Sequence, residues 1–112
     1  MNHDDVGALD PVIHPINRLR ICAALHSAGA REGDGPDREM KFAVLRGLVE
    51  LSDATLSKQL GALESAGYLH RHREYGSSRA KDTVWISLTA KGVAAFQHHL
   101  AALRDIAGQP EY

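Results

Sequence analysis

The sequence predicts a mainly α-helical domain with one small β-hairpin, which is an α+β fold class. Apolar residues recur at helical spacing in four stretches, and two shorter stretches have the composition and alternation of strands. The helical stretches are 15–26, 42–49, 52–66 and 89–107, and the strands are 68–75 and 83–88. The 112 residues, 44% of them hydrophobic, suffice for one modest core, so 1–112 is expected to be a single domain.

The first predicted helix opens at Pro15, a residue suited to a first helical turn. One buried side is formed by its apolar positions Leu19, Ile21, Cys22 and Leu25. The single cysteine is therefore expected to be a packed thiol rather than a redox switch. Outside the helices, residues 1–8 are expected to be a disordered tail. The stretch 29–39 is rich in Gly, Pro and mixed charge, which predicts a mobile surface loop and a shortened edge strand after it.

The next two predicted helices, 42–49 and 52–66, are joined by a very tight turn. Two short helices joined this tightly must cross at a steep angle, which is the helix-turn-helix arrangement. The second helix has well-marked ends, because Ser52 is a favoured N-cap and Gly67 is a favoured residue just past a C-terminus. Its buried stripe consists of Leu56, Leu60 and Leu63.

The opposite side of helix 52–66 carries small and polar residues, where an ordinary surface helix would be dense in Glu and Lys. Small residues let a backbone sink close to base edges, and hydroxyl groups and a lysine donate to phosphates or purine acceptors. A glycine in the middle of a helix lowers its stability by about 1 kcal/mol relative to alanine. Close approach to another molecule would explain why Gly61 is present in this helix. The residues expected to meet DNA are Ser52, Ala54, Thr55, Ser57, Lys58 and Gly61. A solvent-facing helix that happens to be small and polar is the alternative.

The two predicted strands enclose a polar loop, 76–81. From His70 to Lys81 the chain has four Lys or Arg and one Glu, a local net charge of +3 in a protein whose net charge is −1. Such a hairpin concentrates positive potential where phosphates would meet it. A wing at 70–82 is therefore predicted to grip the DNA backbone with Arg71, Arg73, Ser77, Ser78, Arg79 and Lys81. A hairpin charged only for solubility is the alternative.

The last predicted helix follows the N-cap Thr89. Its apolar residues have the 3-4 spacing of a helix–helix seam, and they continue past the point where a small domain needs them. We therefore expect a dimerisation helix over 89–107, acting together with the N-terminal segment, with a seam of Val93, Phe96, Leu100, Leu103 and Ala107. A two-fold dimer reads two half-sites about one DNA turn apart, so the expected operator is palindromic double-stranded DNA.

Taken in order, these blocks resemble the compact subgroup of the MarR-like winged helix-turn-helix transcriptional regulators. The resemblance covers nearly all of 9–106 and is carried by Leu9–Pro15, Asn17–Ile21, Phe42–Arg46, Leu51–Asp53, Leu56–Leu60, Leu63–Glu64, Gly67–Leu69 and Ile86–Gly92. It implies a dimeric, sequence-specific DNA-binding repressor or activator. By the family pattern, the Ser52–Lys58 end of the recognition helix faces the major groove, and the wing around Arg79 contacts backbone or minor groove. MarR-like proteins often respond to small apolar ligands, but the sequence identifies no effector and no cofactor.

Three other function classes have weaker support. A metal-responsive winged-helix repressor would use paired cysteines or an Asp/His set at helical spacing, which His98, His99 and Asp105 do not provide. A winged-helix protein-interaction module without DNA binding is favoured by the single lysine and absent arginine on helix 52–66. No Gly-rich phosphate loop or nucleophile–base order indicates an enzyme. Without a long apolar run or a signal-peptide pattern, no membrane partner is expected and the cytoplasm is the expected location.

Overall fold

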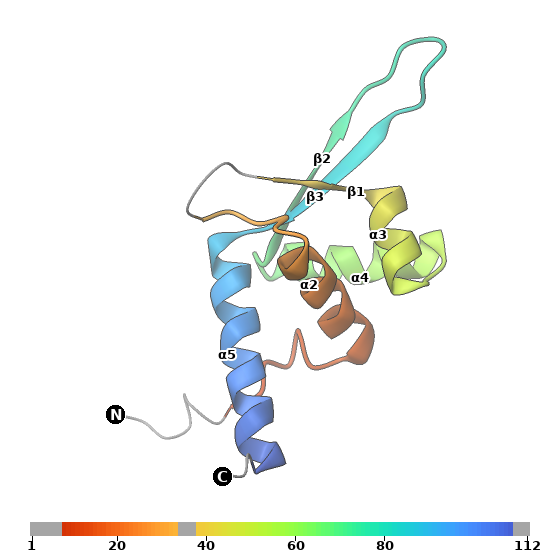
Figure 1. The fold of residues 1–112 in the computed structure, drawn as a ribbon. Helices are drawn as coiled ribbons and strands as arrows, with labels where there is room; N and C mark the ends of the chain where they lie inside the picture. Colours follow the sequence, from red (N-terminus) through yellow and green to blue (C-terminus); the bar gives the residue numbers. More distant parts are fainter. Residues whose placement is uncertain (1–7, 34–37, 109–112) are drawn as a thin grey trace.

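The computed structural model describes residues 8–33 and 38–108 of the chain. Its elements are, in order, α2 (Ile16–Ser27), β1 (Met40–Lys41), α3 (Phe42–Val49), α4 (Asp53–Ser65), β2 (Leu69–Glu74), β3 (Thr83–Leu88) and α5 (Ala90–Ala107). The β2–β3 hairpin projects from one side of the packed helices, and α5 runs away in the opposite direction (Figure 1). The predicted α+β winged helix is confirmed. The predicted tail at 1–8 lies, except for Ala8, outside the described residues.

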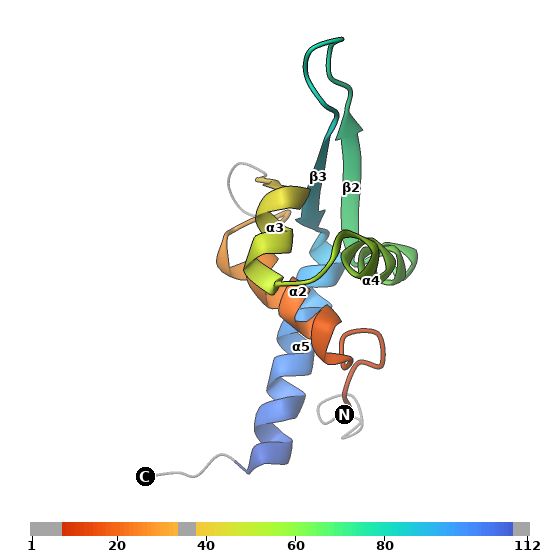
Figure 2. The ribbon, with the colours of Figure 1, turned by 90° about the vertical axis from the view of Figure 1, so that its right-hand side faces the viewer.

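One hydrophobic core joins the three helices α2, α3 and α4 to the inner face of the sheet. The second helix of the helix-turn-helix pair, α4, lies beside β2 (Figure 2). The predicted buried stripe of α4 is confirmed, and the thiol of Cys22 is buried as expected. The fully buried side chains of this core include Ile21, Leu25, Leu45, Leu56, Leu60, Leu63, Ile86 and Leu88.

The ends of α4 and α5 are set by local hydrogen bonds that the sequence predicts. The Ser52 hydroxyl accepts from the Thr55 N–H at 3.2 Å, and the Thr89 hydroxyl accepts from the Gly92 N–H at 3.0 Å. After α4, Gly67 takes a left-handed conformation with φ 79°, and the Tyr68 N–H donates back to the Leu63 carbonyl at 3.0 Å. These caps fix where the outer face of α4 begins and where the hairpin leaves it.

The sheet has the order β1-β3-β2 with antiparallel pairing throughout. In the central strand β3, the polar residue Ser87 is only 6% exposed. The edge strand β1 has two residues, as a shortened strand was expected to have. Cross-strand partners share a face, so Arg71 and Arg73 point to the helix side while His70 and His72 point to the outer side.

The stretch 29–39, predicted to be a mobile surface loop, begins as a hydrogen-bonded segment against the end of β3. Ala30 is buried, its carbonyl accepts from the Leu88 N–H at 2.9 Å, and the Glu32 N–H donates to the Leu88 carbonyl at 2.9 Å. The Glu32 carboxylate also accepts from the Ala90 N–H at the start of α5, at 3.0 Å. Residues 34–37 lie outside the described part, and mobility stays a prediction.

The predicted dimer seam on α5 divides into two parts. Phe96 is 4% exposed, and its ring centroid lies 5.2 Å from that of His26, so this side chain is packed in the core of its own chain. The dimer seam itself stays a prediction. Val93 and Leu100 also pack, partly buried, against that core. The reason is that α5 uses the same apolar stripe to cover α2. Toward the C-terminal end, Leu103 is half-buried and Ala107 is exposed.

A part-buried polar cluster, which we call the Asp10 cluster, ties the N-terminal segment to α5 and to the turn after α4. The Asp10 N–H donates to His99 Nδ1 at 2.9 Å, and the Tyr68 hydroxyl donates to the Asp10 carboxylate at 2.5 Å. The other carboxylate oxygen accepts from the Val12 and Ile13 N–H groups at 2.8 and 3.2 Å. Through Asp10, Tyr68 in the turn between α4 and β2 is thus connected to the middle of α5.

Three groups in and near this cluster have shifted pKa values. Desolvation lowers the pKa of the fully buried His99, and the neighbouring His14 lowers it further. The bond to Asp10 raises the pKa of Tyr68 to about 12. Burial raises the pKa of the Cys22 thiol to about 12, which keeps it protonated and unreactive.

Candidate nucleic-acid interface

The outer face of α4 is exposed and carries the side chains that the sequence predicts. Ala54, Ser57 and Lys58 are exposed, whereas Gly61 is half-buried. The hydroxyls of Ser52 and Thr55 are engaged in the helix cap, since Ser52 Oγ donates to Thr55 Oγ1 at 3.0 Å. The side chains that are free to reach a ligand are therefore concentrated at Ser57 and Lys58, and DNA contacts by Ser52 and Thr55 stay predictions.

An ion pair that sequence reasoning missed braces the start of α4. Arg46 Nε on α3 lies 3.1 Å from the Asp53 carboxylate, with both side chains at least half exposed. Such surface pairs contribute about 0–1 kcal/mol, so this one adds little to the stability of the fold. No pattern in the sequence points to it, because the two residues belong to different helices.

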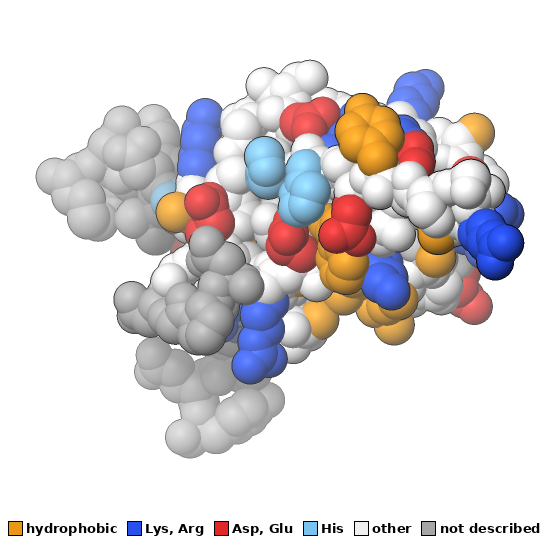
Figure 3. Space-filling view, turned by 90° about the horizontal axis from the view of Figure 1, so that it is seen from above, with side chains coloured by type: hydrophobic (Ala, Val, Ile, Leu, Met, Phe, Trp, Pro, Cys, Tyr) orange, Lys and Arg blue, Asp and Glu red, His pale blue; other side chains and the backbone are white. Residues whose placement is uncertain are grey.

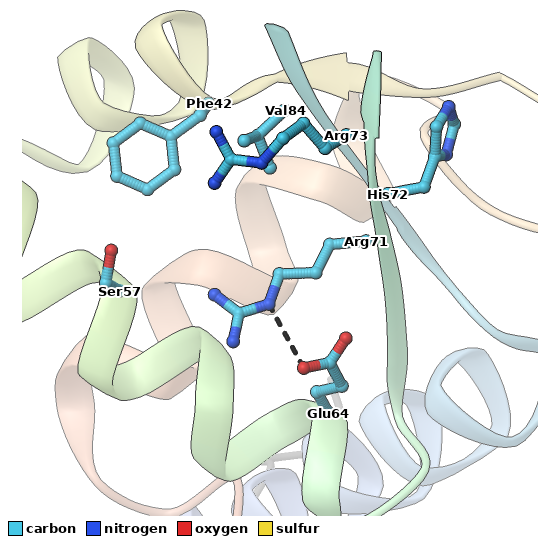
Figure 4. A pocket seen from close by; sticks show the side chains of 7 residues that line it. All are labelled: Phe42, Ser57, Glu64, Arg71, His72, Arg73 and Val84. Carbon is cyan, nitrogen blue, oxygen red and sulfur yellow. Dashed lines mark hydrogen bonds and ion pairs between the residues drawn. The ribbon is translucent and has the colours of Figure 1, made fainter. Parts of the chain in front are cut away.

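The inner face of the wing and the outer face of α4 enclose a hollow of about 360 Å³. We call it the arginine hollow, because the guanidinium groups of Arg71 and Arg73 both extend into it from β2 (Figure 4). Ser57 on α4 lies across from them. His72 points to the other side of the strand. The full lining is Phe42, Ser57, Glu64, Arg71, His72, Arg73 and Val84.

Each of these two arginines is already paired with a carboxylate. Arg71 Nε donates to Glu64 Oε1 at 3.1 Å, and Arg73 Nη1 lies 3.4 Å from Asp82 Oδ2. The sequence analysis missed both acidic partners. Glu64 is on α4 and Arg71 is on β2, and no sequence pattern predicts a contact between these two elements. By contrast, the pairing register of β2 and β3 could have placed Asp82 near Arg73.

Gly61 lies under Arg71. A Cβ atom at position 61 would be 3.8 Å from Arg71 Nη2, an ordinary van der Waals distance. Close approach of another molecule was the expected reason for this glycine. In the structure, the nearest group to that position is a side chain of the same protein, the one that reaches across from the wing.

The wing tip is an ordered turn rather than a free loop. Asp82 Oδ1 accepts from the Gly76 N–H at 2.9 Å, and Ser77 Oγ accepts from the Arg79 N–H at 3.2 Å. Gly76 is required there, because a Cβ atom would lie 2.0 Å from the Ala80 carbonyl oxygen. The turn presents exposed side chains at Ser78, Arg79 and Lys81. Within 8–33 and 38–108, no ion pair involves Lys58, Arg79 or Lys81.

The outer face of the hairpin has a different character. His72 Nδ1 lies 2.9 Å from the Glu39 carboxylate, the His70 and His72 rings are 6.0 Å apart, and Lys41 lies over the Trp85 ring. Seen from above, acidic and basic side chains are interspersed around histidines (Figure 3). The local charge of +3 is therefore not one continuous basic surface, because Glu39, Glu64 and Asp82 add opposing charges to it.

Neither a metal centre nor a membrane span is present in the described residues. Among them, no three His, Cys, Asp or Glu side chains are grouped so that they could hold a metal ion. His98 is exposed whereas His99 is fully buried, so the pair does not share a surface. No helix of the described part combines the length and the apolar character that crossing a membrane requires.

A crossing pair of helices, a capped outer helix and an adjoining wing are the parts of a winged helix. The family described as winged helix DNA-binding domain matches this chain over residues 34–107, which includes α3, α4, the wing and α5. A comparison with curated proteins gave no match. Because the matched region is well over half of the chain, this protein belongs to the winged helix DNA-binding domain family.

Proposed function

We propose that this winged helix domain is a dimeric, sequence-specific regulator of transcription of the compact MarR-like type. It places α4 in the major groove of double-stranded DNA and the wing on the backbone. The observation that carries the proposal is the arrangement of donors: exposed Ser57 and Lys58 on α4 and the ordered tip with Arg79 and Lys81 belong to two elements that enclose one hollow.

The two parts of this surface have different tasks in the proposal. The α4 face is small, so its backbone approaches base edges closely, and Lys58 is the side chain long enough to reach a purine acceptor. Arg79 and Lys81 lack a partner among the described residues and neutralise phosphates, which supplies affinity regardless of sequence. Because α4 bears one lysine, most of the electrostatic affinity comes from the wings.

The dimer is proposed to form through the last turns of α5 with the N-terminal segment. Ile106 is 63% exposed and Ile16 is 65% exposed, so apolar surface remains at the end of the molecule away from the wing. Two copies joined there would carry their α4 helices to two half-sites. A Leu103→Glu variant should then be a monomer by light scattering, whereas a mass equal to that of the wild type would exclude this seam.

Selection of duplexes from a random library, followed by anisotropy titration, tests the function. We expect a palindromic consensus, and Arg79→Ala should weaken binding to all duplexes similarly while reducing the salt slope by about one. A selected pool with no consensus would contradict sequence-specific regulation. If no duplex binds, the alternative is a protein-interaction module. The pairing of Arg71 and Arg73 with carboxylates favours this alternative, because it reduces the positive charge available to DNA.

A further inference from the structure

We propose that the arginine hollow is a preset site for one phosphate group, bound by Arg71 and Arg73, in which Glu64 is the positioning residue. The phosphate of a DNA backbone is the source to which the proposal commits, so it rests on the proposed function. A free phosphate ester has the same chemistry, and the experiment below separates the two.

The pairing with Glu64 leaves the outer end of the Arg71 guanidinium available. Glu64 accepts from Nε, and no other hydrogen bond joins the Arg71 guanidinium to the described residues. The two terminal nitrogens of Arg71 therefore keep their donors, and they extend over Gly61 into the hollow. A guanidinium held at one edge and free at the other binds an oxyanion through two parallel hydrogen bonds without first losing side-chain freedom.

The second arginine completes a two-sided site. Arg73 uses Nη1 for a long contact of 3.4 Å to Asp82, and its guanidinium lies near that of Arg71 in the hollow (Figure 4). Two neighbouring guanidinium groups repel each other, and a phosphate between them would relieve that repulsion. The exposed hydroxyl of Ser57 supplies a third donor from the opposite wall.

The remaining walls of the hollow are apolar. Phe42 at the start of α3 and Val84 on β3 line it, and both are half-buried. Beside these apolar side chains, the Arg71 side chain is 29% exposed and that of Arg73 is 53% exposed. Partial removal of water strengthens charge-assisted hydrogen bonds, most of all at Arg71. This distinguishes Arg71 from the wing-tip cations Arg79 and Lys81, which are exposed and screened by salt.

Glu64 has two opposing effects that substitution can separate. Its carboxylate orients Arg71, which favours binding, but its negative charge repels a phosphate. Glu64→Gln keeps an acceptor for Nε and removes the charge, so this variant should bind duplex DNA about threefold tighter than the wild type. Glu64→Ala removes the orientation as well, and it should bind several times more weakly than Glu64→Gln. Equal affinities of the two variants would contradict a positioning role.

The site is tested by scanning the backbone of a bound duplex with single methylphosphonate linkages, which are uncharged. We expect one linkage in each half-site to weaken wild-type binding about tenfold and to leave the weaker binding of Arg71→Ala unchanged. Arg79→Ala, whose side chain is outside the hollow, is the matched control and should still respond to that linkage. If no linkage is coupled to Arg71, the proposal is overturned.

A second titration distinguishes this failure from failure of the proposed function. In it, the arginine Nε–H signals are followed by NMR while phenyl phosphate is added to the wild-type protein. If the protein binds no duplex but the Arg71 signal shifts saturably, the hollow is a site for free phosphate esters and DNA recognition is wrong. If duplexes bind while the Arg71 signal responds to neither duplex nor phenyl phosphate, the hollow is not a phosphate site and the proposed function stands.

Discussion

The Asp10 cluster and the arginine hollow use their polar groups in opposite ways. In the Asp10 cluster, the carboxylate, the Tyr68 hydroxyl and one nitrogen of His99 all bind partners inside the chain. In the arginine hollow, Glu64 and Asp82 each take one edge of a guanidinium and leave donors facing an open space. The first arrangement holds the N-terminal segment, the turn after α4 and α5 together, and the second leaves hydrogen-bonding capacity for a ligand.

This difference makes the two regions separable by experiment. Substitutions in the Asp10 cluster should change the free energy of unfolding and leave the salt dependence of DNA binding as it is. Substitutions along the outer face of α4 and the wing should change the salt dependence of DNA binding and leave the free energy of unfolding as it is. A variant of either region that changed both quantities strongly would show that the two regions are coupled.

The largest effect is expected from Asp10→Ala. It removes the acceptor of the Tyr68 hydroxyl and of two backbone N–H groups, in a part-buried site. Because these donors lose their partners, the free energy of unfolding measured by urea denaturation should fall by about 3 kcal/mol. Asp10→Asn, which retains one carbonyl acceptor, is the control and should lose less. A loss below about 0.5 kcal/mol, the usual range of surface substitutions, would mean that the cluster does not hold the fold.

Lys58→Ala is expected to have the next largest effect, on binding alone. Its side chain is exposed and makes no ion pair with the described residues, so folding should not depend on it. If Lys58 reads a base, affinity for the selected duplex should fall by about 1–3 kcal/mol and sequence preference should relax at one position. Wild-type affinity together with wild-type preference would remove Lys58 from the interface.

Acidification tests the Asp10 cluster without a substitution. The folded-state pKa of His99 lies below its ordinary value of 6.5, and the pKa of His26 is lowered as well. The unfolded chain therefore binds more protons, so stability is present above pH 6.5 and is lost as the pH falls below it. The urea midpoint is therefore expected to fall as the pH is lowered from 6.5 to 5.5. His98→Gln, on the exposed neighbour, should behave like the wild type, and a pH-independent midpoint would contradict the buried neutral His99.

The smallest effect is expected from Gly61→Ala, which should raise the unfolding free energy by about 1 kcal/mol. The added Cβ meets only Arg71 Nη2, at an ordinary distance, so strain should not offset the gain. Duplex affinity should stay within about twofold if Arg71 covers this position. A loss of affinity without a loss of stability would instead show that DNA approaches the helix backbone at Gly61.

What could be predicted from the sequence was the local part of the structure. Ser52, Gly67 and Thr89 cap helices through bonds to residues one turn away, and the apolar spacing in α4 marks its buried stripe. Partners in different elements gave no signal: Asp10 meets a residue 89 positions away, and Glu64 on α4 meets Arg71 on β2. The burial of Phe96 within its own chain could not be predicted, because an apolar stripe that covers a neighbouring helix has the same spacing as one that joins two copies.

The most direct test is an NMR titration of the protein with its selected duplex, following every backbone amide. If α4 and the wing bind DNA, saturable shifts should be confined to residues 52–61 and 71–82, while the amides of Asp10 and His99 stay in place. Shifts on α2 and the end of α5, with none on α4, would contradict the assignment of the DNA-binding face.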